Sequence, residues 1–373
     1  MKTFIRKYHS WLYDSDYFYN RFNLLANALE EFILNEIDNE ISAKQVSAQF
    51  ESVLKRCDDI DYEDYYTTIA YAILHFLPRY HLFQLAFSKL LDKHILPYKK
   101  FGANILDIGT GPGPALYALS DIYESLIQFG VVKKDFQYIP DYVEQSTGFR
   151  QFLHHFTEFV NYKNFQNENW VVPYHHGSFD KFEDIEFNRS ITDFWGRGRR
   201  IKHRYNIITS ANFFTRLCQV EKQKTKIQDC SRYLRNKGIF VVLGAQSINR
   251  DIQDKNYPTI YRRLKEIIEN CNYSTNKITA KAKQCKIKRD IISFDYSCKF
   301  GDRIKGFHKK IISKLEQYNA INAVVSNEIK KKLLALVEDN YKYTYKTEVH
   351  VFIKSSYPNF LAKRNNKYSR SMK

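Results

Sequence analysis

The stretch from Asn104 to Leu119, NILDIGTGPGPALYAL, constrains the fold of this chain more than any other part of it. A short apolar run ends near the acid Asp107, alternating glycines follow, and a helix-forming sequence comes next. Glycines at a strand-to-helix turn let the backbone reverse sharply and approach a ligand without a Cβ in the way. The stretch therefore predicts a strand, a tight turn and a helix around a ligand site at the carboxyl end of the strand.

Short apolar runs alternate with helical stretches after residue 99. This alternation indicates a doubly wound α/β domain with a mostly parallel sheet. Two later segments, RDIISFDYSCKF and YKYTYKTEVHVFIKSS, have the composition of strands or hairpins, and we expect a late antiparallel strand to complete the sheet. The expected strands of the parallel part are Asn104–Ile108, Asp141–Val143 with the FQYI before it, Trp170–Tyr174, Tyr205–Thr209 and Ile239–Leu243.

The first hundred residues follow a helical pattern. Apolar residues recur at three- and four-residue spacings in YNRFNLLANALEEFILNEI and in YYTTIAYAILHFLPRYHLFQLAFSKLLDKHIL, which predicts long helices. Pro78 lies inside the second run, where we expect a kink or a break. The interpretation divides the chain into a helical N-terminal domain over 1–98, the α/β domain over 99–300 and a basic extension over 301–373.

Charge is the second strong constraint. The chain has 58 Lys and Arg against 41 Asp and Glu, a net charge of +17. Residues 1–100 carry 12 basic and 14 acidic side chains, whereas residues 277–373 carry 23 basic and 8 acidic ones. Such a basic block favours a polyanionic partner, because neutralising phosphates releases their counterions. We therefore expect a nucleic-acid partner, with a solvated lysine-rich surface as the alternative.

A second basic segment lies between the third and fourth expected strands. NRSITDFWGRGRRIKHR combines an aromatic pair with several guanidinium groups. Guanidinium groups bind phosphates bidentately and a Trp ring stacks on an unpaired base, so the segment is a candidate RNA contact. A solvated loop with a buried Trp is the alternative. The candidate nucleic-acid-binding residues are Trp195, Arg197, Arg199, Arg200 and Lys202.

Other features favour a cytoplasmic protein without a membrane or metal site. No apolar run approaches the roughly 20 residues that span a bilayer. The N-terminal MKTFIRKYHSWLYDSDYFYNRF lacks the apolar centre of a signal peptide. The 6 cysteines stand far apart with no CxxC pair, which favours free thiols. The histidine pairs at 154–155 and 175–176 lack the acid or Cys spacing that would complete a metal site, so we expect no metal.

The spacing of the glycines separates two ligand classes. A dinucleotide fingerprint, GxGxxG, counted from Gly109 requires a glycine where Pro114 stands. Asp107, Gly109, Gly111 and Gly113 instead form Asp-x-Gly-x-Gly-x-Gly, which resembles the first motif of class I S-adenosylmethionine-dependent methyltransferases. The resemblance implies S-adenosylmethionine as the cofactor. It also implies a Rossmann-like, doubly wound, mostly parallel sheet, here preceded by an all-helical N-terminal domain.

The resemblance implies a role for residues beyond the turn. In such enzymes the acid at the place of Asp107 orients or balances the methionine ammonium, and the glycine turn lies along the methionine portion. The second strand ends in an acid that accepts both ribose hydroxyls, here Glu144, or Asp141 if the register differs. The third strand ends near the adenine, here at Ser178 and Phe179. The implied cofactor-binding residues are Asp107, Gly109, Thr110, Gly111, Gly113, Glu144, Ser178, Phe179 and Ser210.

The methyl acceptor is expected at the exit of the fourth strand, in YNIITSANFFTRL. Adenine- and cytosine-amino methyltransferases carry Asn/Asp-Pro-Pro-aromatic at this place, and this chain does not. Cys218 lies too far along to be the nucleophile of a 5-methylcytosine enzyme. Asn212 is the candidate catalytic residue, with an amide that orients the acceptor, and a capping role is its alternative.

A narrower resemblance concerns the segments around the motif. YAILHFLPRYHLFQLAFSKLL before it, with YVEQSTGFRQF and NIITSANFFTRL after it, is similar to methyltransferase-like proteins associated with the mitochondrial and bacterial small ribosomal subunit. Ribosomal or transfer RNA is then the expected substrate, on charge grounds. A protein or small-molecule methyltransferase and a catalytically inactive RNA- or ribosome-binding protein stay open as alternatives. The helical N-terminal domain is a candidate surface for a protein partner.

Overall fold

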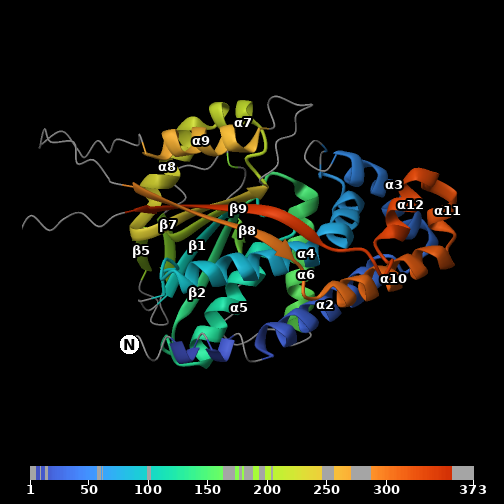
Figure 1. Cartoon of the computed structure of the whole chain (residues 1–373), viewed down its shortest axis with the longest axis horizontal. Helices are drawn as coiled ribbons and strands as arrows, with labels where there is room; N and C mark the ends of the chain where they lie inside the picture. Colours follow the sequence, from blue (N-terminus) through green and yellow to red (C-terminus); the bar gives the residue numbers. More distant parts are fainter. Residues whose placement is uncertain are drawn as a thin grey trace, which may run out of the picture.

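A seven-stranded sheet runs through the middle of the molecule (Figure 1). Its strands are β1 (Gly102–Ile108), β2 (Gln137–Val143), β3 (Tyr174–His175), β6 (Tyr205–Ala211), β7 (Leu234–Ala245), β8 (Ile287–Ser297) and β9 (Thr344–Lys354). They lie in the order β3-β2-β1-β6-β7-β9-β8. Pairing is parallel from β3 to β7, whereas β9 pairs antiparallel with both β7 and β8. This architecture confirms the Rossmann-like, doubly wound fold.

The structure is a computed structural model of the chain. It describes residues 6–8, 10–12, 16–56, 60, 62–98, 102–162, 173–175, 179, 188–192, 198–202, 205–245, 256–269 and 287–354. Its helices are α2 (Tyr17–Glu36), α3 (Glu40–Arg56), α4 (Tyr65–Asp92), α5 (Pro114–Gln128), α6 (Thr147–Tyr162), α7 (Leu217–Lys222), α8 (Lys224–Tyr233), α9 (Tyr257–Glu269), α10 (Gly301–Gln317), α11 (Ala320–Val324) and α12 (Asn327–Ala335). A separate two-stranded sheet pairs β4 (Asn188–Thr192) with β5 (Gly198–Lys202).

The strand order fixes where a ligand can bind. From β1 the chain builds outward through β2 to β3, then crosses to β6 on the other side of β1 and continues to β7. The carboxyl ends of β1 and β6 therefore flank the point at which the strand order reverses. Open α/β sheets bind their ligands in the crevice at this point.

The expected strands agree with the observed ones. Four of them lie within β1, β2, β6 and β7, and the expected third strand meets β3 at Tyr174. Residues 170–172 of that third strand lie outside the described residues. The late antiparallel strand is β9, which is inserted between β7 and β8, so that β8 forms the edge of the sheet.

Side chains alternate between the two faces of the sheet and form two separate cores. On one face Ile105, Ile207 and Val241 pack in the core that contains α4, α5 and α6. On the other face Leu106 and Ile208 pack with residues of α8 and α9. Figure 1 shows α7, α8 and α9 on one side of the sheet and α4 and α5 on the other.

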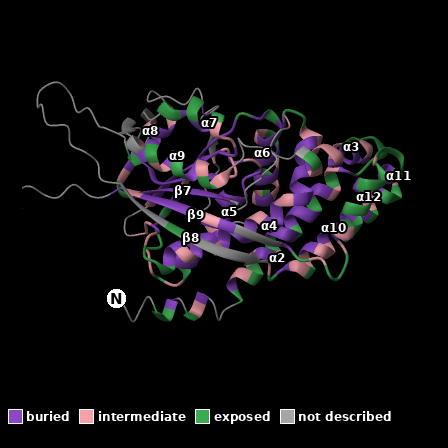
Figure 2. Cartoon of the chain, turned by 45° about the horizontal axis from the view of Figure 1, so that its top comes forward, coloured by how far each residue is buried: buried purple, intermediate pink, exposed green. Residues whose placement is uncertain are grey.

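The N-terminal helices pack against the α/β domain through α4. This helix runs without interruption through Pro78, so the break that was one of the two expectations there does not occur. Of its 28 residues 21 are buried, and Figure 2 shows α4 as one of the most buried helices. Packing on nearly all sides offsets the hydrogen bond that a proline removes from a helix.

The C-terminal helices join the N-terminal ones instead of forming a separate layer. Helix α10 packs against α2, and α11 packs against α3, at the end of the molecule far from β5 (Figure 1). Glu30 on α2 is buried and accepts from Arg303 at 3.0 Å and from Lys310 at 2.6 Å. The region 301–354 therefore contributes helices to the helical layer and β9 to the sheet.

Candidate cofactor and acceptor site

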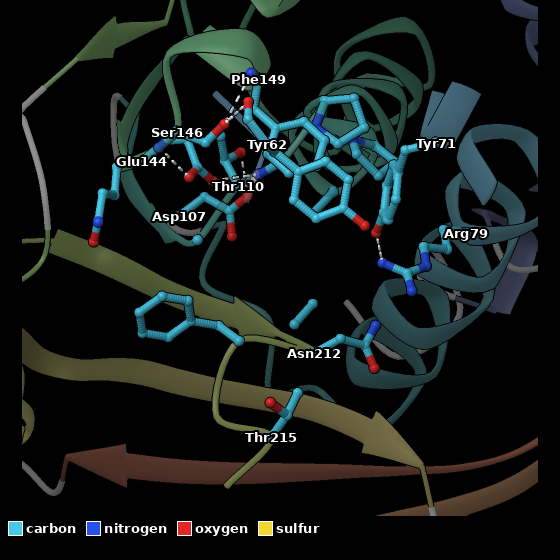
Figure 3. Close-up of a pocket in the computed structure, with 18 of the residues that line it drawn as sticks. Tyr62, Tyr71, Arg79, Asp107, Thr110, Glu144, Ser146, Phe149, Asn212 and Thr215 are labelled. Carbon is cyan, nitrogen blue, oxygen red and sulfur yellow. Dashed lines mark hydrogen bonds between the residues drawn. The ribbon is translucent and has the colours of Figure 1, made fainter. Parts of the chain in front are cut away.

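A pocket of about 390 Å³ opens at the carboxyl ends of β1, β2 and β6. This volume lies within the range of small-molecule sites. Its walls come from the β1–α5 turn, from the segments that follow β2 and β6, and from the N-terminal helical region (Figure 3). The lining includes six residues expected from the sequence, Asp107, Gly109, Thr110, Gly111, Glu144 and Asn212.

The glycine turn between β1 and α5 forms one wall of the pocket. Gly109 and Gly111 have φ values of +67° and +56°, in the region that favours glycine. A Cβ on Gly109 would overlap the ring of Phe213, whereas a Cβ on Gly111 would meet no atom within 4 Å. Gly109 is therefore needed for packing, and Gly111 leaves open backbone along the pocket.

Asp107, the penultimate residue of β1, is only 2% exposed. Its Oδ2 accepts a hydrogen bond from the Thr110 hydroxyl at 2.6 Å, and its Oδ1 accepts one from the Thr209 hydroxyl at 2.6 Å. Burial raises the pKa of Asp107 to about 6, although these two hydrogen bonds act to lower it. The charge of the nearby Glu144 raises it further.

Glu144 directly follows β2 and is buried. Its Oε2 accepts from the backbone N–H of Gly111 at 2.9 Å, and its Oε1 accepts from the backbone N–H of Ser146 at 2.9 Å. Burial raises the pKa of this carboxyl, and the backbone hydrogen bonds partly offset that effect. The bond to Gly111 ties the glycine turn to the end of β2, so the expected ribose ligand lies beside the turn.

Asp107 and Glu144 together give the pocket a buried acidic end. Among the described residues, both carboxylates accept hydrogen bonds from hydroxyl and backbone N–H groups, and neither forms an ion pair. Burying an uncompensated charge is costly. The site is therefore complementary to a ligand that brings positive charge and hydrogen-bond donors.

Asn212 lies across the pocket from Asp107 (Figure 3). Its backbone has a φ of +52°, and its N–H donates to the carbonyl of Leu243 at 2.9 Å. The left-handed conformation is one that Asn adopts more readily than most residues. Both of its expected roles, capping the strand exit and orienting an acceptor, stay predictions.

Gly113, Phe179 and Ser210, which are described, are not among the residues that line this pocket. Gly113 is the N-cap of α5, where a Cβ would overlap Leu153. The Ser210 hydroxyl is buried without a hydrogen-bond partner among the described residues. Phe179 is buried and meets the Phe213 ring edge-on. Ser178 lies outside the described residues.

The helical region supplies a wall that we did not predict from the sequence. Tyr62 stacks on Phe149 with ring centroids 4.3 Å apart, and Tyr71 meets both rings edge-on. Arg79 lies over the Tyr71 ring, with its Cζ 5.0 Å from the ring centroid, and donates to the Tyr71 hydroxyl. Tyr71 and Arg79 lie on α4, and nothing in the helical repeat of that segment marked them as pocket residues.

Hydrogen bonds hold this wall against the segment that follows Glu144. The Tyr62 carbonyl accepts from the Gly148 N–H at 3.1 Å and from the Ser146 hydroxyl. The Glu63 carboxylate accepts from the Thr147 N–H at 3.1 Å. The residues just before α4 are therefore fixed to the loop that carries the acidic end of the pocket.

Three of the candidate nucleic-acid residues belong to the described part of the chain. Arg199, Arg200 and Lys202 are on β5, where Arg200 pairs with Ser190 of β4. Trp195 and Arg197 lie outside the described residues. Within the described ranges no helix is long and apolar enough to cross a membrane. The same ranges contain no cluster of three or more His, Cys, Asp and Glu side chains suited to a metal ion.

The sequence matches no protein-family model and no curated protein. Among solved structures it is similar to the CurJ carbon methyltransferase, with 10% identity and a TM-score of 0.39, over 88% of this chain and 70% of that one. It is also similar to phosphoethanolamine N-methyltransferase 2 of Haemonchus contortus, with 13% identity and a TM-score of 0.36. That match covers 82% of this chain and 66% of the other. A third similar structure is a precorrin-6y C5,15-methyltransferase of Geobacter metallireducens, with 8% identity and a TM-score of 0.35. The match covers 72% of this chain and 86% of that one. Similarity at these low identities and TM-scores assigns no activity to the chain, and the site itself must indicate the function.

Proposed function

We propose that this protein is an S-adenosylmethionine-dependent methyltransferase. The observation that supports this proposal most strongly is the pair of buried carboxylates, Asp107 and Glu144, which line one pocket at the switch point and form no ion pair with a described residue. S-adenosylmethionine carries an ammonium group, a sulfonium group and a ribose diol. It therefore supplies both the positive charge and the hydroxyl donors that the two carboxylates accept.

The residues at the acidic end fit this cofactor. Asp107 would bind the methionine ammonium, and Glu144 would accept the ribose hydroxyls through lone pairs that its two backbone hydrogen bonds leave free. The open side of Gly111 would let the methionine portion lie against the backbone. Thr110 and Thr209 orient Asp107, because each donates to one of its oxygens.

The reaction needs mainly positioning from the protein. The cofactor supplies a methyl group on a sulfonium, which is a good leaving group. A heteroatom of the acceptor would take this methyl group with its lone pair, and the electron pair of the carbon–sulfur bond would stay on the sulfur. Asn212, across the pocket from Asp107, would hold the acceptor with its amide. Fixing the two reactants in line accounts for most of the rate gain.

For the acceptor we propose RNA. The net charge of +17 and the excess of basic residues over 277–373 support this choice. The hairpin of β4 and β5 adds Arg199, Arg200 and Lys202. RNA of the small ribosomal subunit is the first pool to test, because of the resemblance around the glycine motif. A small-molecule acceptor is the second candidate, because Tyr62 and Tyr71 wall the pocket on its acceptor side.

Calorimetric titration with S-adenosylmethionine and S-adenosylhomocysteine tests the cofactor. We expect micromolar binding to the wild type and at least about 30-fold weaker binding to Asp107→Ala, because a buried charged contact is lost. Asp302→Ala is the matched control, since Asp302 is a fully exposed acid on α10. Equal affinities in wild type and Asp107→Ala would contradict the assignment.

Transfer of a labelled methyl group separates the acceptor classes. Total RNA, total protein and small metabolites are offered to the wild type, and label in the RNA fraction alone is expected. Label in another fraction would exclude RNA as the acceptor. Retained RNA affinity without any cofactor binding would instead indicate a binding module with a methyltransferase-like fold.

A further inference from the structure

Arg79 places a cation in the same pocket as the two carboxylates. It projects from α4 toward the cavity beside Asn212, on the opposite side from Asp107 and Glu144 (Figure 3). Its guanidinium lies over the Tyr71 ring and donates one hydrogen bond to the Tyr71 hydroxyl. These two contacts fix the plane of the guanidinium without neutralising its charge.

No described carboxylate forms an ion pair with Arg79, although the side chain is half-buried. Glu63 is the remaining acid among the described residues that line the pocket, and its carboxylate accepts from the Thr147 N–H. A half-buried cation without a counter-ion is unfavourable unless a ligand supplies the negative charge. Arg216, the N-cap of α7, adds a second basic residue to the lining.

The charges of the pocket are therefore separated. Asp107 and Glu144 attract a cationic ligand at one end, and Arg79 attracts an anion at the other. An acceptor with an anionic group and no cationic group would be repelled from the acidic end and held with its anionic group on Arg79. Its neutral part would then point back into the cavity, toward Asn212.

We propose that Arg79 binds a phosphate group of the methyl acceptor and thereby orients it in the pocket. A guanidinium donates two parallel hydrogen bonds to a phosphate, which fixes the direction of the ligand as well as its position. The proposal rests on the proposed function only in assigning the acidic end to the cofactor. The phosphate belongs either to an RNA strand or to a free small phosphate ester.

The test uses inorganic phosphate and adenosine 5′-monophosphate as probes on the full chain loaded with S-adenosylhomocysteine, followed by phosphorus NMR titration. Arg79→Gln should weaken phosphate binding at least about tenfold, because a charge-assisted hydrogen bond is lost. Arg79→Lys should give an intermediate value, since it keeps the charge without the planar fork. Arg263→Gln, an arginine paired with Glu221 on the other side of the sheet, should bind phosphate as the wild type does.

The affinity for S-adenosylhomocysteine separates failure of this proposal from failure of the proposed function. It should stay within about twofold in Arg79→Gln, which also shows that the variant folds. Phosphate binding that Arg79→Gln leaves unchanged overturns the phosphate site. A wild type that binds no S-adenosylhomocysteine overturns the proposed cofactor, and the same phosphate comparison on the unloaded chain then decides the role of Arg79.

The source of the phosphate is distinguished by a short 5′-phosphorylated RNA. If this RNA binds more tightly than the mononucleotide and the gain is lost in Arg79→Gln, the phosphate belongs to an RNA strand. Equal binding of RNA and mononucleotide, both lost in Arg79→Gln, identifies a free phosphate ester. RNA binding that is independent of Arg79 places the strand elsewhere and overturns the RNA form of the proposal.

Discussion

Burial controls the charge of Asp107 and so the pH range in which the pocket binds a cation. With its pKa raised to about 6, this carboxyl is ionised above pH 6 and neutral below it. The ammonium of S-adenosylhomocysteine stays charged throughout this range. We expect the affinity to fall as the pH is lowered from about 8 to about 5, approaching tenfold for each pH unit below the pKa. Calorimetric titration with S-adenosylhomocysteine across this pH range measures the fall in affinity.

Asp107→Asn is the matched control for this pH dependence. The amide has the shape of the carboxyl but does not ionise, so the variant should bind weakly at every pH. A shallow dependence would persist in it, because burial also raises the pKa of Glu144. A wild type with one affinity from about pH 5 to about pH 8 would show that Asp107 does not meet the ammonium.

Single residues were predictable from the sequence where local backbone geometry determines their place. Asp107 and Gly111 follow from a strand that ends in a glycine turn, and Glu144 follows from the next strand in the same register. Tyr62 and Arg79 reach the pocket only because the helical region docks on the α/β domain, and no local pattern encodes that docking. Gly148 shows how close the docking is, since a Cβ there would overlap the Tyr62 carbonyl.

At the scale of elements, α5 is attached to α2 and α4 through one buried acid. Asp121 accepts from Arg21 at 2.8 Å, from Gln84 at 2.9 Å and from the Tyr80 hydroxyl. Asp121→Ala should lower the free energy of unfolding by about 3 kcal/mol, because it leaves the charge of Arg21 without its partner. Urea denaturation followed by circular dichroism measures this change.

Glu124→Ala, on the same helix, is the control for Asp121→Ala. Its carboxylate accepts a hydrogen bond from the exposed Gln128 amide at 3.3 Å. We expect its effect on the free energy of unfolding to be within about 0.5 kcal/mol. Equal losses in the two variants would show that Asp121 does not hold these helices together.

Elements were predictable to different degrees. Short continuous apolar runs between helical stretches indicated the strands of the parallel sheet, because both faces of these strands are buried. Of the kink or break expected at Pro78, the break does not occur, because local propensity yields to burial along α4. The position of β9 between β7 and β8 could not be predicted from local sequence, because β7 and β9 pair across more than a hundred residues of the chain.

At the scale of the whole molecule, helices from both ends of the chain share one core. His75 and His81 on α4 and His308 on α10 lie at this junction. The Nε2 of His308 donates to the Ile73 carbonyl at 2.8 Å, so its Nδ1 accepts from the Tyr343 hydroxyl. Burial lowers the pKa of His75 and of His308 to about 4, and that of His81 to about 3.

These buried histidines should make the fold sensitive to mild acid. Their pKa in the unfolded chain is about 6.5, so between about pH 6.5 and about pH 4 the unfolded state binds protons that the folded state does not. Stability is therefore lost as the pH falls through this window, by about 2 kcal/mol per histidine at about pH 5. Denaturation midpoints at about pH 7.5 and about pH 5 measure the loss.

His75→Leu tests the origin of this loss, because the Nε2 of His75 is buried without a hydrogen-bond partner among the described residues. The variant removes one titrating group of the three while keeping a side chain of similar volume. It should lose about 2 kcal/mol less than the wild type between the two pH values. If wild type and variant lose the same free energy, His75 does not titrate on unfolding. The acid sensitivity would then come from His81 and His308, whose pKa values burial also lowers, or from paired carboxylates.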